Sequence, residues 1–250
     1  CVGRSLFLRH MANQAAVILA AGQGTRMKSG VPKVLHQVCG KEMVSLVVDA
    51  AKGAGFDPTV VVVPTDGSPI RNVLGDGVGY AVQPKPLGTG HALLQSRNLL
   101  QGVDNVAVLN GDVPLIRSET LASMMRRHLD REACITLLLA TPEAPGDLGR
   151  VLRDASGQIT AIVEVGQSGG EARSITEVNS GVYCFRSSWL WPHLEGLSPS
   201  PSGEVLLTDL VALASGQRMV IESVQARPPQ EILGVNTRVQ LAEAEGVLRQ

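Results

Sequence analysis

Short apolar runs alternate with helix-like stretches through the first half of the chain. Most of these runs are apolar at every position instead of every second one, which predicts strands covered by other elements on both faces. Three of the five runs are followed directly by glycine, proline or asparagine. The strand candidates are Ala15–Ala21, Thr59–Val63, Gly79–Val82, Asn105–Leu109 and Cys134–Ala140.

Helices are predicted between these strands. Met43–Ala54 has helical spacing, a helix follows from about His91, and Ser118 is expected to cap a third that runs to about residue 131. The order strand–helix–strand predicts an α/β fold with a parallel, doubly wound, Rossmann-like sheet. Ligands bind such sheets beyond the carboxyl ends of the strands, at the switch point. We therefore expect a site formed by the loop after Ala21 and the loop that holds Asp112.

The pattern changes after about residue 145. Three strand-like runs follow without long helices between them, at Gly149–Arg153, Gln158–Glu164 and Glu177–Phe185. We expect this mixed-sheet region to lie over the first half and to form the acceptor side of a cleft. Two helices are expected near the end, at about Leu206–Ser215 and Thr237–Arg249.

The length of 250 residues suits one large α/β domain or two small ones. We expect residues 1–10 to be a disordered or artificial extension and 11–250 to be the domain. Its parts are nucleotide-binding (15–145), sugar-binding (146–235) and a C-terminal helix (236–250). The formal net charge of −1 shows no electrostatic footprint for nucleic acid or membrane. No apolar run reaches membrane-spanning length, and four cysteines without metal or disulfide spacing indicate a reducing, cytoplasmic setting.

A glycine loop follows the first predicted strand, in the run AAGQGTRMKS, and a Pro-Lys pair follows a few residues later. Glycines after a buried strand let backbone N–H groups approach an anion, while Arg26 and Lys33 add positive charge. A dinucleotide-binding loop would need a third glycine where Met27 stands, and a P-loop motif is absent. The remaining alternatives are a triphosphate cradle and an ordinary glycine turn.

Several further motifs occur in order along the chain. These are Gln83 with LGTGHA at 87–92, GDVPL at 111–115, Gly149-Arg150, Ile162-Val163-Glu164, NSGVY at 179–183 and Gly234-Val235-Asn236. With the glycine loop, they resemble the sugar-1-phosphate nucleotidyltransferases, and most closely the uridylyltransferase domains of bacterial N-acetylglucosamine-1-phosphate uridylyltransferases. The resemblance extends from about Ala15 to Gln240.

This resemblance implies Mg²⁺-dependent transfer of UMP from UTP to N-acetylglucosamine 1-phosphate, with release of pyrophosphate. It assigns Arg26 and Lys33 to the phosphates and to catalysis, and Asp112 and Asn236 to the metal. Spacing alone would favour Asp112 as a turn or cap residue and Asn236 as the N-cap of the last helix, and the ordered motifs reverse this. The implied nucleotide-binding residues are Ala21, Gly22, Gly24, Thr25, Gln83, Gly88, Thr89 and Gly111, and the implied sugar-binding residues are Gly149, Glu164 and Asn179.

The chain departs from the family pattern in places. Asn110 stands where relatives often have tyrosine, and the run before Thr208 lacks their paired tyrosines. His91 invites a catalytic role, but attack by an anionic phosphate needs no imidazole. The hexapeptide repeats of an acetyltransferase β-helix are absent from this sequence. The expected assembly is a homo-oligomer, a trimer if a β-helix domain follows in the full-length protein.

Two other functions remain open. The same fold serves thymidylyl-, cytidylyl- and molybdopterin-guanylyltransferases, although the run GTGHA favours the uridylyl branch. A domain of another class, an inactive nucleotide-binding regulator, would be expected to lack Arg26, Lys33 or Asp112, and all three are present.

Overall fold

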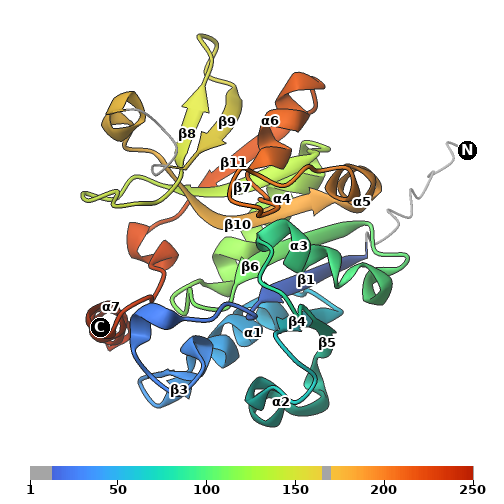
Figure 1. Cartoon of the computed structure of the whole chain (residues 1–250). Coiled ribbons are helices and arrows are strands. Elements are labelled where there is room, and N and C mark those ends of the chain that lie inside the picture. Colours follow the sequence, from blue (N-terminus) through green and yellow to red (C-terminus); the bar gives the residue numbers. More distant parts are fainter. Residues whose placement is uncertain (1–12, 165–169, 250) are drawn as a thin grey trace, which may run out of the picture.

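The computed structural model describes residues 13–164 and 170–249, so the prediction for residues 1–10 lies outside the described part. One sheet runs through the molecule (Figure 1). Its main path contains, in spatial order, β5 (Gly79–Val82), β4 (Thr59–Val63), β1 (Gln14–Leu19), β6 (Asn105–Asn110), β10 (Val178–Arg186), β7 (Ile135–Ala140) and β11 (Ile221–Gln225). All five strands expected in the first half are confirmed, within one or two residues at their ends.

The sheet is doubly wound and mixed, and six of the seven strands on its main path run in the same direction. β1 pairs in parallel with β4 on one side and with β6 on the other, and β11 pairs in parallel with β7. β10 is antiparallel to both of its neighbours, β6 and β7. The expectation that the later strands lie over the first half is therefore wrong for β10, which is inserted in the main sheet. Both faces of β10 carry apolar side chains, and both are buried there.

Two smaller strand pairs complete the β structure. β8 (Arg150–Arg153) and β9 (Ile159–Val163) form an antiparallel hairpin, and β8 joins the main sheet through Val178 of β10. Both strands were expected from the sequence, although their pairing was not, and the hairpin projects away from the sheet at the top of Figure 1. β2 (Gln37–Val38) and β3 (Lys41–Glu42) pair with each other near the first helix. That pair was not expected, because each strand has only two residues.

Helices cover both faces of the sheet. The α-helices are α1 (Met43–Gly53), α2 (Pro69–Leu74), α3 (Thr89–Leu94), α4 (Ser118–Asp130), α5 (Ser187–Glu195), α6 (Asp209–Gly216) and α7 (Arg238–Leu248). The 3-10 turns are η1 (Thr25–Met27), η2 (Lys33–Leu35), η3 (Gly75–Gly77), η4 (Arg97–Leu100), η5 (Gly170–Ser174) and η6 (Pro229–Ile232). None of the helices in these described ranges is long and apolar enough to cross a bilayer.

Alternate residues of β1 show why its apolar run has no period of two. Ala15 and Val17 pack in the cluster that contains α3, α5 and α6 side chains. Ala16 and Ile18 pack in the cluster that contains α1, α2 and α4 side chains. Successive side chains of a strand point to opposite faces, so a strand with a hydrophobic cluster on each side is apolar at every position.

The cap expected at Ser118 is wrong, and two other helices differ from what the sequence predicted. Ser118 is the first residue of α4 and Arg117 is its N-cap, with no side-chain cap hydrogen bond. Ser118 instead lies against α1, where a methyl group on Gly53 would meet its hydroxyl oxygen. The helix expected from His91 begins at Thr89. α5 was not expected, because its sequence contains Pro192 inside the helix.

Candidate active site

The switch point of the sheet lies between β1 and β6. β1 continues to β4 on one side, while β6 comes later in the chain and pairs on the other side. Leu19 and Asn110, the last residues of the two strands, are register partners, and the N–H of Gly111 donates to the carbonyl of Leu19 at 2.9 Å. The glycine loop and the loop with Asp112 therefore leave the same edge of the sheet side by side, as expected.

The glycine loop is in direct contact with Lys33. Gly24 has φ +60°, and a Cβ built there would lie 2.5 Å from the Cβ of Lys33. Only glycine allows this backbone shape and this approach together. Lys33 itself begins the 3-10 turn η2, directly after Pro32. The loop and the lysine thus form one unit at the carboxyl end of β1.

Four predicted residues meet at this edge. The ammonium of Lys33 forms an ion pair with the carboxylate of Asp112 and donates to the amide oxygen of Asn236 at 3.0 Å. Arg26 donates to the same amide oxygen at 2.9 Å. The side chains of Lys33 and Asp112 are 14% and 18% exposed. The structure therefore brings together the two cationic residues and the two metal-ligand candidates.

Asn236 is held in place from two directions. The N–H of Val235 donates to the carbonyl of Asp112 at 2.8 Å, which joins the two metal-ligand candidates through the backbone. The N–H of Asn236 donates to the side chain of Gln240 at 2.8 Å. The alternative that Asn236 caps the last helix is wrong, because Thr237 is the N-cap of α7 and forms a capping box with Gln240. The Asn236 side chain is thereby left to face Lys33.

The donor set at this point suits a hard cation. Asp112 supplies a carboxylate and Asn236 an amide oxygen, and both already converge on one positive charge, the Lys33 ammonium. Mg²⁺ typically takes one or two carboxylates and completes its shell with water and substrate phosphates. Within residues 13–164 and 170–249 no three His, Cys, Asp or Glu side chains cluster as a complete metal site. The protein would therefore supply only part of the shell.

A cavity of about 340 Å³ opens beside this cluster. Seven of the predicted site residues line it: Ala21, Gly22, Lys33, Gln83, Gly88, Thr89 and Asp112. Its remaining lining residues are Leu19, Ala20, Val34, Pro86, Ala92, Asn110 and Glu204. Gly24, Thr25, Arg26 and Gly111 were also expected at the nucleotide and do not line this cavity. Arg26 reaches the cluster through Asn236.

A second cavity of about 320 Å³ shares Thr89, Asn110 and Glu204 with the first. Two predicted sugar-binding residues, Glu164 and Asn179, line it. Its other lining residues are Gly181, Tyr183, Leu206, Leu207 and Thr208. The shared residues make the two cavities adjoining parts of one cleft, large enough for two different groups.

Polar side chains in the second cavity are desolvated. Burial raises the pKa of the Glu164 carboxyl, and the negative charge of Asp209 raises it further. The amide of Asn179 donates to the hydroxyl of Tyr183 at 2.6 Å. Gly149, the third predicted sugar residue, does not line the cavity. It lies beneath Glu164, where a Cβ would come within 3.4 Å of the carboxylate.

The sequence did not single out Glu204, which lines both cavities. Glu204 comes just before Val205. The N–H of Val205 donates to the carbonyl of Leu87 at 2.9 Å, and the carbonyl of Val205 accepts from the N–H of Gly90 at 2.8 Å. This backbone pairing ties the loop before α3 to the segment before α6. Contacts so distant along the chain leave no local pattern that could have indicated Glu204.

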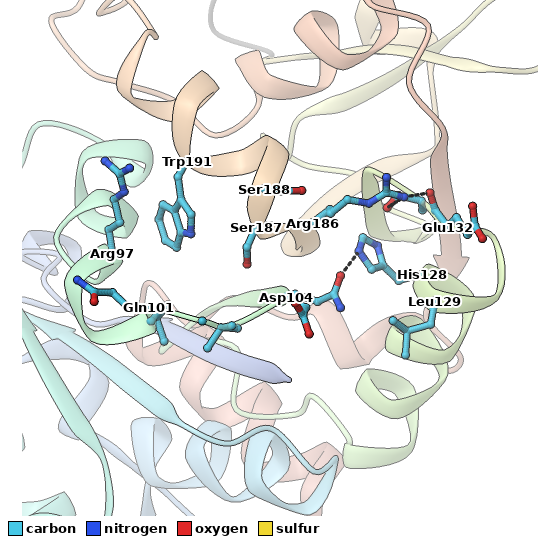
Figure 2. Close-up of a pocket in the computed structure, with 15 residues that line it drawn as sticks. Arg97, Gln101, Asp104, His128, Leu129, Glu132, Arg186, Ser187, Ser188 and Trp191 are labelled. Atoms are coloured by element: carbon cyan, nitrogen blue, oxygen red, sulfur yellow. Dashed lines mark hydrogen bonds between the residues drawn. The ribbon is translucent and has the colours of Figure 1, made fainter. Parts of the chain in front are cut away.

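A larger cavity, of about 650 Å³, contains none of the predicted site residues (Figure 2). Asn105, the first residue of β6, lines it, whereas Asn110 at the other end of that strand lines the cleft, roughly 17 Å away for six residues. His128 lines it too and contacts Thr136 at 3.0 Å and Asn105 at 3.2 Å. Burial lowers the pKa of His128 to about 4. The imidazole is thus a neutral, hydrogen-bonded packing group.

Comparisons with known proteins agree with this geometry. Residues 16–213 match the family model described as MobA-like NTP transferase domain. The chain is 42% identical over 241 residues to the bifunctional protein GlmU of Heliobacterium modesticaldum, covering 96% of this chain and 53% of that protein. It is 42% identical to GlmU of a Geobacillus species (strain WCH70), with 96% and 53% covered, and 38% identical to GlmU of Clostridioides difficile, with 95% and 52% covered.

The chain thus spans about half the length of the curated relatives it matches. The family model, by contrast, covers most of the chain, including the glycine loop, Lys33, Asp112 and both cavities. The chain therefore belongs to the MobA-like NTP transferase domains, a family of nucleotidyltransferases.

Proposed function

We propose that the chain transfers UMP from UTP to N-acetylglucosamine 1-phosphate, giving UDP-N-acetylglucosamine and pyrophosphate. The observation that carries this proposal is the pair of adjoining cavities that share Thr89, Asn110 and Glu204. One is bordered by the glycine loop, Lys33 and Asp112, and the other by carboxylate, amide and hydroxyl groups that suit a sugar. A transferase that joins two substrates needs both compartments in contact.

The reaction forms a bond between a phosphate oxygen of the sugar phosphate and the α-phosphorus of UTP. The bond from that phosphorus to the oxygen of the β-phosphate breaks, and pyrophosphate leaves with the electron pair. Because the attacking oxygen is already anionic, the protein has no proton to remove. Its work is to position the two substrates and to neutralise negative charge. Lys33 and Arg26 supply fixed positive charge for this purpose.

Asp112 and Asn236 would hold Mg²⁺, which shields the charge of the nucleotide phosphates when it is bound. The Lys33 ammonium contacts a side-chain oxygen of each of these two residues. Lys33 therefore balances the Asp112 charge, and its flexible four-carbon side chain would allow its ammonium to reach the phosphates as well.

Base and sugar recognition are assigned to opposite ends of the cleft. Gln83 and Gly88 would read the uracil edge, and Glu164 and Asn179 would accept and donate hydrogen bonds to the sugar, with Gly149 beneath. We place the reaction in the cytoplasm, since the buried thiols of Cys134 and Cys184 are free, as is usual in a reducing compartment.

The test is pyrophosphate release by the 250-residue chain in Mg²⁺, with each of four nucleoside triphosphates and a panel of sugar 1-phosphates. We expect the highest kcat/KM for UTP with N-acetylglucosamine 1-phosphate. Preference for CTP, dTTP or GTP would instead support one of the related transferases. UTP binding without pyrophosphate release for any pair would favour an inactive regulatory domain and overturn the proposal.

A further inference from the structure

A chain of hydrogen-bonded side chains leads from the nucleotide cavity into α3. Gln83 lies just after β5, is 6% exposed and lines the cavity. Its amide nitrogen lies 3.0 Å from the carbonyl oxygen of Gly88 and 3.0 Å from Nδ1 of His91. Its backbone N–H donates to the carbonyl of Val63 at 2.8 Å. Both the main chain and one end of the Gln83 amide are therefore held by the protein.

The carbonyl of Gly88 shows which end of the Gln83 amide lies beside it. A carbonyl oxygen can only accept, so the Gln83 atom beside it must be the NH₂ group. That group has two hydrogens, and the second points to Nδ1 of His91. With both hydrogens donated to the protein, the side-chain polar atom left for a ligand is Oε1, which only accepts.

The same reasoning sets the tautomer of His91. If Nδ1 accepts from Gln83, the imidazole is neutral and carries its hydrogen on Nε2. The amide nitrogen of Gln95 lies 3.4 Å from Nε2, but its shorter bond is to the His91 carbonyl, at 3.0 Å. The 3.0 Å contact with Gln83 is the shorter contact of the ring and therefore decides the tautomer.

We propose that His91 is a positioning residue that sets base selectivity by holding the Gln83 amide with Oε1 toward the nucleobase. The inference rests on the proposed function, in that it takes a pyrimidine nucleotide to bind against Gln83. It accounts for a histidine that the transfer chemistry does not use. The imidazole acts on the base through Gln83 and does not touch the reacting phosphates.

The expected preference follows from donor and acceptor patterns. Among the residues that the structure describes, no backbone carbonyl of a turn or loop accepts a hydrogen bond from the N–H of Gly88. Gln83 and Gly88 therefore offer an acceptor and a donor, which match the N3–H of uracil and a neighbouring carbonyl. A rotated Gln83 amide would present its NH₂ group instead of Oε1, so Gln83 and the Gly88 N–H would together offer two donors, which match the N3 and O2 acceptors of cytosine. Loss of His91 removes a restraint against that rotation.

The test is equilibrium binding of UTP and CTP to the 250-residue chain in Mg²⁺. For His91→Leu we expect the ratio of the CTP Kd to the UTP Kd to fall by about tenfold, the effect of one hydrogen bond. His91→Asn keeps an acceptor near the position of Nδ1 and should keep the ratio within about twofold of wild type. Gln95→Leu is the control, since it alters the other side of His91 and should leave the ratio unchanged.

A double-mutant cycle separates positioning from packing. In a Gln83→Ala background, His91→Leu should have no further effect on the ratio, because the group it orients is gone. A further decrease there, or an unchanged ratio in the single variant, would overturn the inference. Wild type with no preference between UTP and CTP would overturn it as well. Binding is measured without turnover, so an inactive domain that prefers UTP would refute the proposed function and leave this test intact.

A spectroscopic measurement tests the tautomer of His91 directly. NMR of ¹⁵N-labelled histidine in the wild-type chain reports which ring nitrogen of His91 carries the hydrogen. Comparison with His91→Asn assigns the signal. We expect Nδ1 to be unprotonated and Nε2 to be protonated, and the reverse tautomer would contradict the arrangement on which the inference stands.

Discussion

Gly88→Ala tests whether the loop and the segment that border the cleft pack as described. Gly88 has φ +97° and ψ 171°, a backbone shape that essentially only glycine adopts. A Cβ there would lie 2.8 Å from the backbone nitrogen of Val205, and closer still to its carbonyl oxygen. Backbone atoms cannot rotate away as the end of a side chain can. The strain therefore falls on the pairing between the loop at 87–90 and the segment at 204–207.

The magnitude follows from two costs. A non-glycine residue in this region costs about 1–3 kcal/mol, and forcing an extra methyl into a packed contact costs about 1–3 kcal/mol more. Part of this energetic cost is relieved if the segment at 204–207 moves away from the loop at 87–90. We therefore expect Gly88→Ala to lower the free energy of unfolding by about 3 kcal/mol. UTP affinity should fall as well, since Gly88 and Glu204 both line the nucleotide cavity.

Urea unfolding of the wild type and the variant measures the first effect, and UTP titration measures the second. Gly30→Ala is the matched control, because a Cβ there meets no atom within 4 Å and Gly30 has no positive φ. It should change the free energy of unfolding by less than about 0.5 kcal/mol. If Gly88→Ala is as stable as Gly30→Ala, the two segments do not pack as described and the reasoning is refuted.

Three further predictions concern single side chains. Lys33→Ala should lower kcat by at least about 10²-fold with a much smaller change in UTP affinity, and Lys33→Arg should not restore it; loss of UTP binding at unchanged kcat would contradict this. Asp112→Ala should remove turnover in Mg²⁺ while circular dichroism shows an intact fold, so substantial turnover would exclude its metal role. His128, with its pKa held at about 4, stays neutral in the folded state while unfolded chains gain a proton below about pH 6.5. Stability should therefore fall by about 2 kcal/mol from pH 6.5 to pH 5, and His128→Gln should reduce this loss in urea unfolding.

The strands of the first half could be predicted because burial on both faces leaves a local record in the sequence. The place of β10 could not, because its position between β6 and β7 depends on packing between residues that are far apart in the chain. α5 was missed for a local reason, since Pro192 lies inside it. Its first residues precede that proline, and Trp189 and Leu190 pack it onto the sheet. Tertiary packing thus outweighed propensity there.

The site residues likewise divide into those that the sequence could predict and those that it could not. Lys33, Asp112 and Asn236 could be expected together only through the ordered motifs, since Asn236 comes from the far end of the chain. Their contacts confirm that they meet, whereas their roles toward phosphate and metal remain predictions. Glu204 could not be found beforehand, because its place in the cleft depends on backbone pairing between 87–90 and 204–207.

The central antiparallel strand has a consequence for folding during synthesis. β6 and β7 emerge from the ribosome before β10, yet they are not bonded to each other in the finished sheet. Until residues 178–186 arrive, each presents an unpaired edge, which is a surface prone to association with other chains. β10 also carries Asn179 and Gly181 of the second cavity. The step that joins β6 to β7 is therefore the same step that supplies these residues, so a nascent chain cannot form the second cavity before β10 lies between the two strands.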